Sequence, residues 1–257
     1  MSYGLCVAFG LTLAFAAQRL QRDDRPDLAP HRQALLLAAV IGAVAGAYLL
    51  ELPADLFGWS WRPPLLPRDA LPLGGRTVLG GLIGGWLLVE AVKWRRGIRG
   101  ATGDRFALPL ALALASGRIG CWLAGCCAGR ACGNAWGSLA IIDATGMARY
   151  PVQAIEALFH AGAALTLGLL AWRDRARLDA PRLFAGQRLA AYLTSYAALR
   201  FVLEWLRENP PLPHLGLTWY QVLAAVLFAL AGGTWLARNL AARRDCRAQA
   251  ARQDRRA

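Results

Sequence analysis

Residues 33–52 read QALLLAAVIGAVAGAYLLEL and contain no charged side chain before Glu51. A helix of about 20 apolar residues is long enough to cross the ~30 Å hydrocarbon core of a bilayer. The whole chain is similarly apolar, because 56% of its 257 residues are hydrophobic and its mean hydropathy is +0.34. A soluble domain of this length is rarely so apolar. The sequence therefore predicts a membrane protein.

Further apolar stretches resemble this one, so the chain is predicted to cross the membrane about seven times. The stretches are Ser2–Gln18, Gln33–Leu52, Thr77–Val92, Phe106–Gly125, Val152–Trp172, Leu189–Leu206 and Leu217–Ala237. Because the third is short, six spans with an interfacial third stretch remain an alternative. No linker or low-complexity segment divides the chain, so we expect an all-α polytopic protein with one integral-membrane domain over residues 1–240.

Basic residues outnumber acidic ones by 29 to 16, which gives a formal net charge of +13. Nucleic-acid-binding proteins also have such a balance. Here, however, most basic residues follow the first, third, fifth and seventh apolar stretches, and cytoplasmic loops of membrane proteins carry this excess. We therefore expect an outside N-terminus, a cytoplasmic C-terminus and no nucleic-acid partner. The predicted location is the inner (plasma) membrane of a bacterium, with the lipid bilayer as a partner.

This topology assigns the remaining segments to one side of the membrane. Residues 51–76 and 128–150 are expected as outer-face loops, and residues 241–257 as a basic cytoplasmic tail. No basic residue precedes the first stretch, so we expect an uncleaved helix there and not a cleaved signal peptide.

Arg118 lies inside an apolar stretch, residues 113–127 (ALASGRIGCWLAGCC). A charge at the centre of a bilayer costs roughly 2.5–3.5 kcal/mol on insertion scales. The side chain either reaches the outer surface or serves a function. Glycines at positions 117, 120 and 125 allow a ligand or another helix to approach closely, which favours a functional role.

Four polar residues share one face of the sixth stretch. Their helical spacing of four, four and three places Tyr196, Arg200, Glu204 and Arg207 together. Mutual neutralisation of Arg200 and Glu204 is one interpretation. Two arginines and one glutamate nevertheless leave one positive charge in excess, and a guanidinium donates to two phosphate oxygens at once.

A second polar stripe, Gln153, Glu156 and His160, begins the fifth stretch. We expect Glu156 to be the counter-ion of Arg118 or Arg200, and His160 to be a hydrogen-bonded packing residue. Together with the two arginines, the stripe predicts a polar cavity near the outer leaflet.

Sulfur and glycine clusters allow several interpretations. Cys121, Cys126, Cys127 and Cys132 are first interpreted as disulfides or small packing residues, with redox, metal or catalytic roles as alternatives. Paired CxxC spacing is lacking, so no metal site or cofactor is assigned. The glycine pairs of residues 80–85 favour close helix packing, and amides open to an anionic head group are the minority interpretation.

Five motifs resemble those of the prolipoprotein diacylglyceryl transferase family, from Tyr3 to about Gln221. They are residues 80–84 (GGLIG), residues 117–120 (GRIG) with the later Gly129-Arg130, Trp136-Gly137, residues 149–156 (RYPVQAIE) and residues 196–207 (YAALRFVLEWLR). In this order, on about seven helices, they are fairly specific to the family.

The resemblance implies transfer of a diacylglyceryl group from phosphatidylglycerol to the lipobox cysteine of a prolipoprotein, forming a thioether, without a cofactor. Its partners would be phosphatidylglycerol and the prolipoprotein signal peptide. Arg118 and Arg200 would be the catalytic cations that stabilise the leaving phosphate. The residues expected to bind substrate are Tyr3, Gly80, Gly81, Gly120, Arg130, Gln153, Glu156, Tyr196, Glu204 and Arg207.

The sequence departs from the family pattern at the expected proton acceptor for the thiol and at polar positions expected around the head group. Leu79 stands where the family has a histidine before GGLIG, and Tyr150 replaces the histidine of its RHP motif. Cys121 and Cys126 stand at the positions of an asparagine and an acid. The alternatives are therefore a non-catalytic lipid- or lipoprotein-binding protein on the same scaffold, and a thiol-redox or metal protein that uses the cysteines.

Overall fold

The computed structural model describes residues 2–21, 26–59, 77–133, 136–143, 145–177 and 182–254, and most of them are helical. The α-helices are α1 (Ser2–Leu20), α2 (Arg32–Leu49), α3 (Leu52–Phe57), α4 (Val78–Arg95), α5 (Asp104–Leu123), α6 (Val152–Ala176), α7 (Arg188–Leu203) and α8 (Trp219–Asp254). Each predicted apolar stretch coincides with one long helix. The helical fold class is therefore confirmed.

In the described parts of the chain, four helical segments are long and apolar enough to cross a membrane. They are Asp27–Phe57, Asp104–Leu123, Val152–Ala176 and Trp219–Ala241. Helices satisfy their backbone hydrogen bonds internally, so they are suited to a medium without water. The protein is thus a membrane protein, while the count of seven spans and the orientation of the termini stay predictions.

Short elements interrupt the expected all-α pattern. Three 3₁₀ helices, η1 (Pro26–His31), η2 (Gly137–Leu139) and η3 (Glu204–Leu206), lie between the α-helices. A two-stranded antiparallel hairpin, β1 (Ile141–Ile142) and β2 (Ala148–Arg149), lies in the segment expected as a loop. Most of the other expected loop, residues 60–76, lies outside the described residues.

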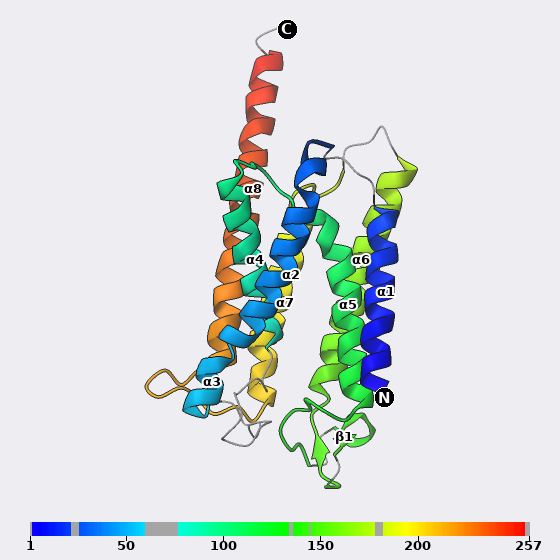
Figure 1. Ribbon diagram of the computed structural model, residues 1–257, viewed down its shortest axis with the longest axis vertical. Helices are drawn as coiled ribbons and strands as arrows, with labels where there is room; N and C mark the ends of the chain where they lie inside the picture. The colour runs from blue at the N-terminus through cyan, green and yellow to red at the C-terminus, as the bar shows by residue number, and fades with distance from the viewer. Residues whose placement is uncertain are drawn as a thin grey trace.

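The long helices form two groups that stand side by side (Figure 1). In one group α5 packs between α1 and α6; in the other α2 packs on α4 and α7 on α8. Contacts of α7 with α5 and α6 join the two groups. We call the end of the bundle where α1 begins the site end. Beyond the opposite end, α8 continues as an unbroken helix into the basic tail (Figure 1).

Glycines set the distance between α2 and α4. A Cβ placed on Gly80 would lie 2.5 Å from the Gly46 carbonyl oxygen, and one on Gly46 would lie 2.8 Å from the Gly84 Cα. Neither contact is sterically allowed for a larger residue, so the two backbones touch directly. The helix-packing interpretation of this glycine run is confirmed, and it matches the small-residue interfaces of membrane helices.

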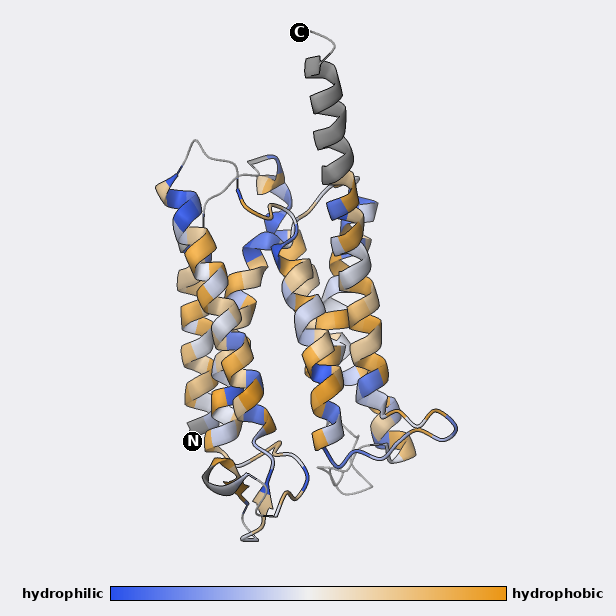
Figure 2. Cartoon of the chain, turned by 180° about the vertical axis from the view of Figure 1, so that it is seen from behind, coloured by the Kyte–Doolittle hydropathy of each residue, from blue (hydrophilic) through white to orange (hydrophobic). Residues whose placement is uncertain are grey.

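Large apolar side chains point outward from the bundle. Phe9 and Phe15 on α1 and Leu158 on α6 are among the exposed residues. Figure 2 shows apolar residues along the helix surfaces and more hydrophilic ones toward the helix ends. An apolar exterior of this extent is suited to lipid and not to water. The core between the groups is formed around Tyr196, Leu79 and Leu227, each almost fully buried.

Candidate active site: a buried arginine–glutamate cluster

Charged side chains from three α-helices and the 3₁₀ turn after the third meet at the site end, where the two helix groups join. Arg118 comes from α5, Glu156 from α6, Arg200 from the end of α7, and Glu204 and Arg207 from the turn that follows. The sequence predicted one continuous helix through Glu204 and Arg207. In the structure, α7 instead ends at Leu203 and is followed by the 3₁₀ helix η3. Pro210 and Pro211, which cannot continue a helix, follow shortly afterwards.

Glu156 is the centre of the cluster. Its Oε2 pairs with Arg118 Nε, and its Oε1 lies 3.6 Å from Arg200 Nε and 3.5 Å from Arg207 Nη2. Glu204 Oε2 lies 2.5 Å from Arg200 Nη1 and 4.0 Å from Arg207 Nε. Glu156 was expected to be the counter-ion of Arg118 or Arg200. In the structure it pairs with both of them and also with Arg207.

All five groups are buried, with exposed fractions from 0% for Glu156 to 9% for Arg118. The alternative in which the Arg118 side chain reaches the outer surface is therefore wrong. Three guanidinium groups and two carboxylates leave one positive charge in excess. Buried charge is costly unless it is paired, so the excess favours an anionic ligand.

Tyr196 of α7 connects its helix group to Arg118 and Glu156 of the other group. Arg118 Nη2 donates to its hydroxyl at 3.5 Å, and the hydroxyl donates to Glu156 Oε2 at 3.4 Å. Beside it, the His160 Nδ1 lies 2.7 Å from the Tyr192 hydroxyl, and the His160 ring packs 4.6 Å from the Tyr196 ring. His160 is thus the hydrogen-bonded packing residue that the sequence predicted.

Several buried polar atoms of the cluster have no hydrogen-bond partner among the described residues. They are Gln153 Oε1, Glu156 Oε1, and the Nε and Nη2 atoms of Arg207. A buried donor without an acceptor costs about 1–3 kcal/mol. A phosphate that entered here would supply acceptors to the guanidinium donors.

Two residues of this site were not predicted from the sequence. Glu204 Oε1 accepts hydrogen bonds from Asn209 Nδ2 at 2.5 Å and from Thr218 Oγ1 at 3.2 Å. Both donors lie in the connection between α7 and α8, where polar residues are common. No local pattern distinguishes them from other loop residues, and only the packed structure brings them to the carboxylate.

The remaining predicted site residues lie around the cluster or away from it. Tyr3 packs on Gly120, since a Cβ at position 120 would lie 3.1 Å from the Tyr3 Cδ2. The Arg130 guanidinium lies 5.9 Å from the centre of the Tyr150 ring, and its backbone amide donates to the Leu206 carbonyl at 2.7 Å. The nearest neighbours of Gly80 are Gly46, Leu50 and Thr77, and those of Gly81 are Ala43 and Ala47, not the charged groups.

An ion-pair clamp holds the loop over the site end. Arg149 contacts Asp143 Oδ2 at 2.5 Å, Glu208 Oε1 at 3.1 Å and the Gly129 carbonyl at 3.2 Å. The Arg149 guanidinium, with help from the Thr145 hydroxyl, holds the pKa of Asp143 well below its usual value. The hydrogen bond to Asp143 in turn raises the pKa of Arg149.

Three of the four clustered cysteines come together. The Sγ atoms of Cys121, Cys126 and Cys127 all lie within 4.8 Å of one another, and Cys132 is outside this group. The expected cluster of four is therefore wrong in Cys132, whose Sγ lies 3.7 Å from the Gly133 carbonyl. None of these cysteines forms a disulfide in the described structure, and the Cys246 side chain lies outside the described residues.

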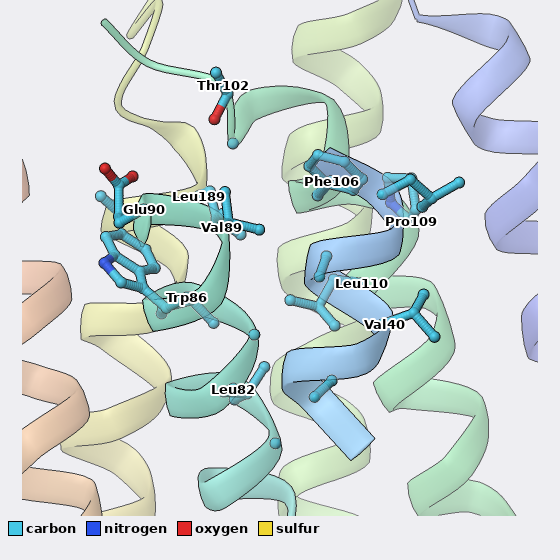
Figure 3. Close-up of a pocket in the computed structure, with 18 of the residues that line it drawn as sticks. Val40, Leu82, Trp86, Val89, Glu90, Thr102, Phe106, Pro109, Leu110 and Leu189 are labelled. Atoms are coloured by element: carbon cyan, nitrogen blue, oxygen red, sulfur yellow. The ribbon is translucent and has the colours of Figure 1, made fainter. Parts of the chain in front are cut away.

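An apolar groove of about 490 Å³ opens between the two helix groups (Figure 3). Its walls include Val40 of α2, Leu82 and Trp86 of α4, and Phe106 and Leu110 of α5 (Figure 3). Phe106 belongs to the first turn of α5, so the groove extends away from the site end. Its volume and apolar lining are suited to a hydrocarbon chain.

Residues 1–237 match the family model described as prolipoprotein diacylglyceryl transferase. The chain belongs to the prolipoprotein diacylglyceryl transferase family. A protein of Clostridium perfringens named phosphatidylglycerol–prolipoprotein diacylglyceryl transferase 2 is 29% identical over 217 residues, which cover 81% of this chain and 79% of that protein. A transferase of the same name, without the number, from Bordetella parapertussis is 30% identical, over 91% of this chain and 84% of that protein.

The residues that depart from the family pattern have clear places in the structure. Leu79 is 1% exposed and packs in the apolar core, so nothing there accepts a proton. The Tyr150 ring packs edge-on against Trp136 at 5.8 Å between ring centres. Cys121 and Cys126 belong to the cysteine group. The anion-binding residues are thus assembled, while the family's thiol-activating histidine is replaced by a packing residue.

Proposed function

We propose that this chain transfers the diacylglyceryl group of phosphatidylglycerol to the lipobox cysteine thiol of a prolipoprotein, forming a thioether in lipoprotein maturation. Membership of the family and the names of its relatives support this assignment. The observation that carries it is the buried Arg118–Glu156–Arg200 cluster with its excess positive charge. A lipid phosphate is the anion that such a site receives from a bilayer.

The chemistry is a substitution at a glycerol carbon. The thiolate sulfur forms a bond to that carbon, and the bond from the carbon to a phosphate oxygen breaks. Glycerol phosphate leaves with the electron pair and an additional negative charge. Arg118 and Arg200 stabilise this charge, because fixed cations in a water-poor site need no reorganisation during the reaction.

The carboxylates act as positioning residues. Glu156 and Glu204 hold the guanidinium groups, including that of Arg207, whose Nε and Nη2 are ion-paired with them but form no hydrogen bond among the described residues. The other residues assigned to substrate binding are Tyr3, Gly80, Gly81, Gly120, Arg130, Gln153 and Tyr196. The apolar groove would accept acyl chains of the lipid, which enter laterally from the bilayer.

The proposed topology follows from the charge pattern of the sequence. Seven spans would form one domain over residues 1–240 in the bacterial inner membrane, with the N-terminus outside and the basic tail in the cytoplasm. The site end then faces the outer side, where the signal peptide of a prolipoprotein presents its cysteine.

The test is complementation of cells depleted of their own transferase, together with transfer from labelled phosphatidylglycerol to a lipobox peptide in detergent. Wild type is expected to restore growth and to form the thioether, and Arg200→Ala is expected to fail in both assays. Arg95→Ala is the matched control, because Arg95 is exposed and is the last residue of α4, at the end of the bundle opposite the site end. A stably inserted wild type that forms no product contradicts the proposal.

One observation favours a second function. Leu79 replaces the family histidine, so the chain would bind phosphatidylglycerol without transferring its diacylglyceryl group. This alternative predicts that the lipid co-purifies with wild type but not with Arg200→Ala, while no thioether forms in either sample.

A further inference from the structure

The cysteine group lies directly beside the arginine cluster. Cys121 follows Arg118 by three residues on α5, one turn further along the helix. Gln153, which precedes Glu156 on α6, donates from its Nε2 to the Cys126 carbonyl at 2.9 Å. The same two helices therefore position both the guanidinium groups and the thiols.

The backbone turns back to bring the three sulfurs together. Beyond the end of α5, Gly125 and Cys127 have positive φ angles of 64° and 63°, and the Cys126 amide donates to the Cys121 carbonyl at 3.1 Å. A positive φ is uncommon for a residue other than glycine. The loop thus returns Cys126 and Cys127 to the helix that carries Cys121.

The separation of the sulfurs is suited to a tetrahedral metal ion. Zinc–thiolate bonds of about 2.3 Å place neighbouring sulfurs about 3.8 Å apart. The three Sγ atoms, all within 4.8 Å of one another, reach that spacing by small side-chain rotations. In the described chain, no histidine, aspartate or glutamate joins the group within the same distance.

Exposure of the three thiols differs, which leaves one side accessible. Cys121 is buried, Cys127 is half-buried and Cys126 is exposed. Structural zinc sites have four protein ligands, whereas catalytic sites have three and an open position. We propose that Cys121, Cys126 and Cys127 bind a zinc ion whose open position takes the thiol of the acceptor cysteine. This inference rests on the proposed function.

Zinc would provide the thiol activation that Leu79 cannot. A thiol that coordinates zinc loses its proton, here to water, and remains nucleophilic as a zinc-bound thiolate. Its sulfur then forms the bond to the glycerol carbon, and glycerol phosphate leaves with the electron pair of the broken carbon–oxygen bond. The thioether product is a weaker zinc ligand than a thiolate, so it is released.

Metal analysis of the full chain in detergent tests the site without any need for activity. Protein reduced and exposed to zinc, then dialysed, is expected to retain about one zinc per chain. The triple variant Cys121→Ser, Cys126→Ser, Cys127→Ser is expected to retain only background zinc. Cys132→Ser is the matched control and is expected to bind like wild type, since Cys132 lies outside the group.

A cobalt-substituted sample tests the open position. Cobalt(II) bound by thiolates gives a visible spectrum that reports its ligands, so a lipobox peptide with a cysteine is expected to change the spectrum. The same peptide with serine in place of cysteine is expected to leave it unchanged. Removal of zinc is expected to slow diacylglyceryl transfer about 100-fold, and zinc should restore the rate in wild type only.

The outcomes separate this inference from the proposed function. Zinc retention and a spectral response to the cysteine peptide support the site even if no thioether forms, which would refute the transferase function alone. Transfer at the wild-type rate by the triple serine variant overturns the inference and leaves the transferase function intact. Wild type that binds no zinc after reduction, or binds only copper(I), also overturns it.

Discussion

Glu156→Gln is the substitution with the largest expected effect in the cluster. The glutamine has nearly the same shape, but it removes the one carboxylate that faces Arg118, Arg200 and Arg207 together. Three buried guanidinium groups would then share only Glu204. The variant therefore changes the electrostatics of the site with little change in packing.

The contact distances give the magnitude of the effect. At an effective dielectric constant of 20, a charge pair 3.5 Å apart has a gross attraction of about 5 kcal/mol, and Arg207 and Arg200 both lie near that distance from Glu156. Desolvation offsets much of this attraction. Removing one partner of a buried ion pair usually costs about 3–5 kcal/mol, so we expect Tm to fall by about 10 °C.

Thermal unfolding in detergent, with and without phosphatidylglycerol, is the assay. The lipid phosphate supplies a negative charge to the altered site, so it should raise Tm more in Glu156→Gln than in wild type. Transfer should nevertheless fall about 100-fold, because the guanidinium groups lose the carboxylate that positions them.

Glu208→Gln is the matched control. Glu208 pairs with Arg149 at 3.1 Å, but its side chain is 37% exposed, so its loss should cost less than about 1 kcal/mol. If Glu156→Gln unfolds at the same temperature as Glu208→Gln and keeps its transfer rate, the assignment of Glu156 as the central counter-ion is refuted.

Three further predictions concern the anion site, the helix contact and the loop. Arg200→Lys should lower the transfer rate at least about tenfold in a steady-state assay, because an ammonium lacks the planar set of donors with which a guanidinium contacts Glu204 and phosphate together. An unchanged rate would exclude a role for these paired guanidinium donors. Gly46→Val should destabilise the protein by at least about 1–3 kcal/mol in thermal unfolding, because a Cβ there clashes with the backbone of α4. Gly168→Ala should not destabilise it, because a Cβ at position 168 meets nothing within 4 Å. The folded pKa of Asp143 is depressed, so the pairing with Arg149 contributes fully above the usual carboxyl pKa of 3.8 and is lost as pH falls toward the lower folded value. Cleavage of the 129–149 loop in limited proteolysis should therefore stay constant from about pH 8 to about pH 5, the range in which the Asp143–Arg149 pair persists. Cleavage should increase in Arg149→Ala. An increase near pH 6 in wild type would contradict this reasoning.

Local pattern was enough for the helices and for the polar faces. An apolar stretch of membrane length specifies a helix wherever it lies, and spacings of three and four place Gln153, Glu156 and His160 on one side of it. These features depend on residues close in the sequence. The helical fold, the polar helix faces and close helix packing at the glycine run were therefore predictable, whereas the partner helix of that run was not.

The tertiary structure alone decided which helices meet and which atoms touch. The sequence offered Glu156 as a counter-ion of one arginine, but the join between α5, α6 and α7 places it against three. Asn209 and Thr218 reach Glu204 only because the connection between α7 and α8 folds back over it. Cys132 is close to Cys127 in sequence but lies outside the sulfur group, and its backbone amide donates to the Ala148 carbonyl of the hairpin. Hydropathy and helical period are local properties, whereas ion-pair geometry and sulfur separation depend on contacts between distant segments, and no local pattern encodes those.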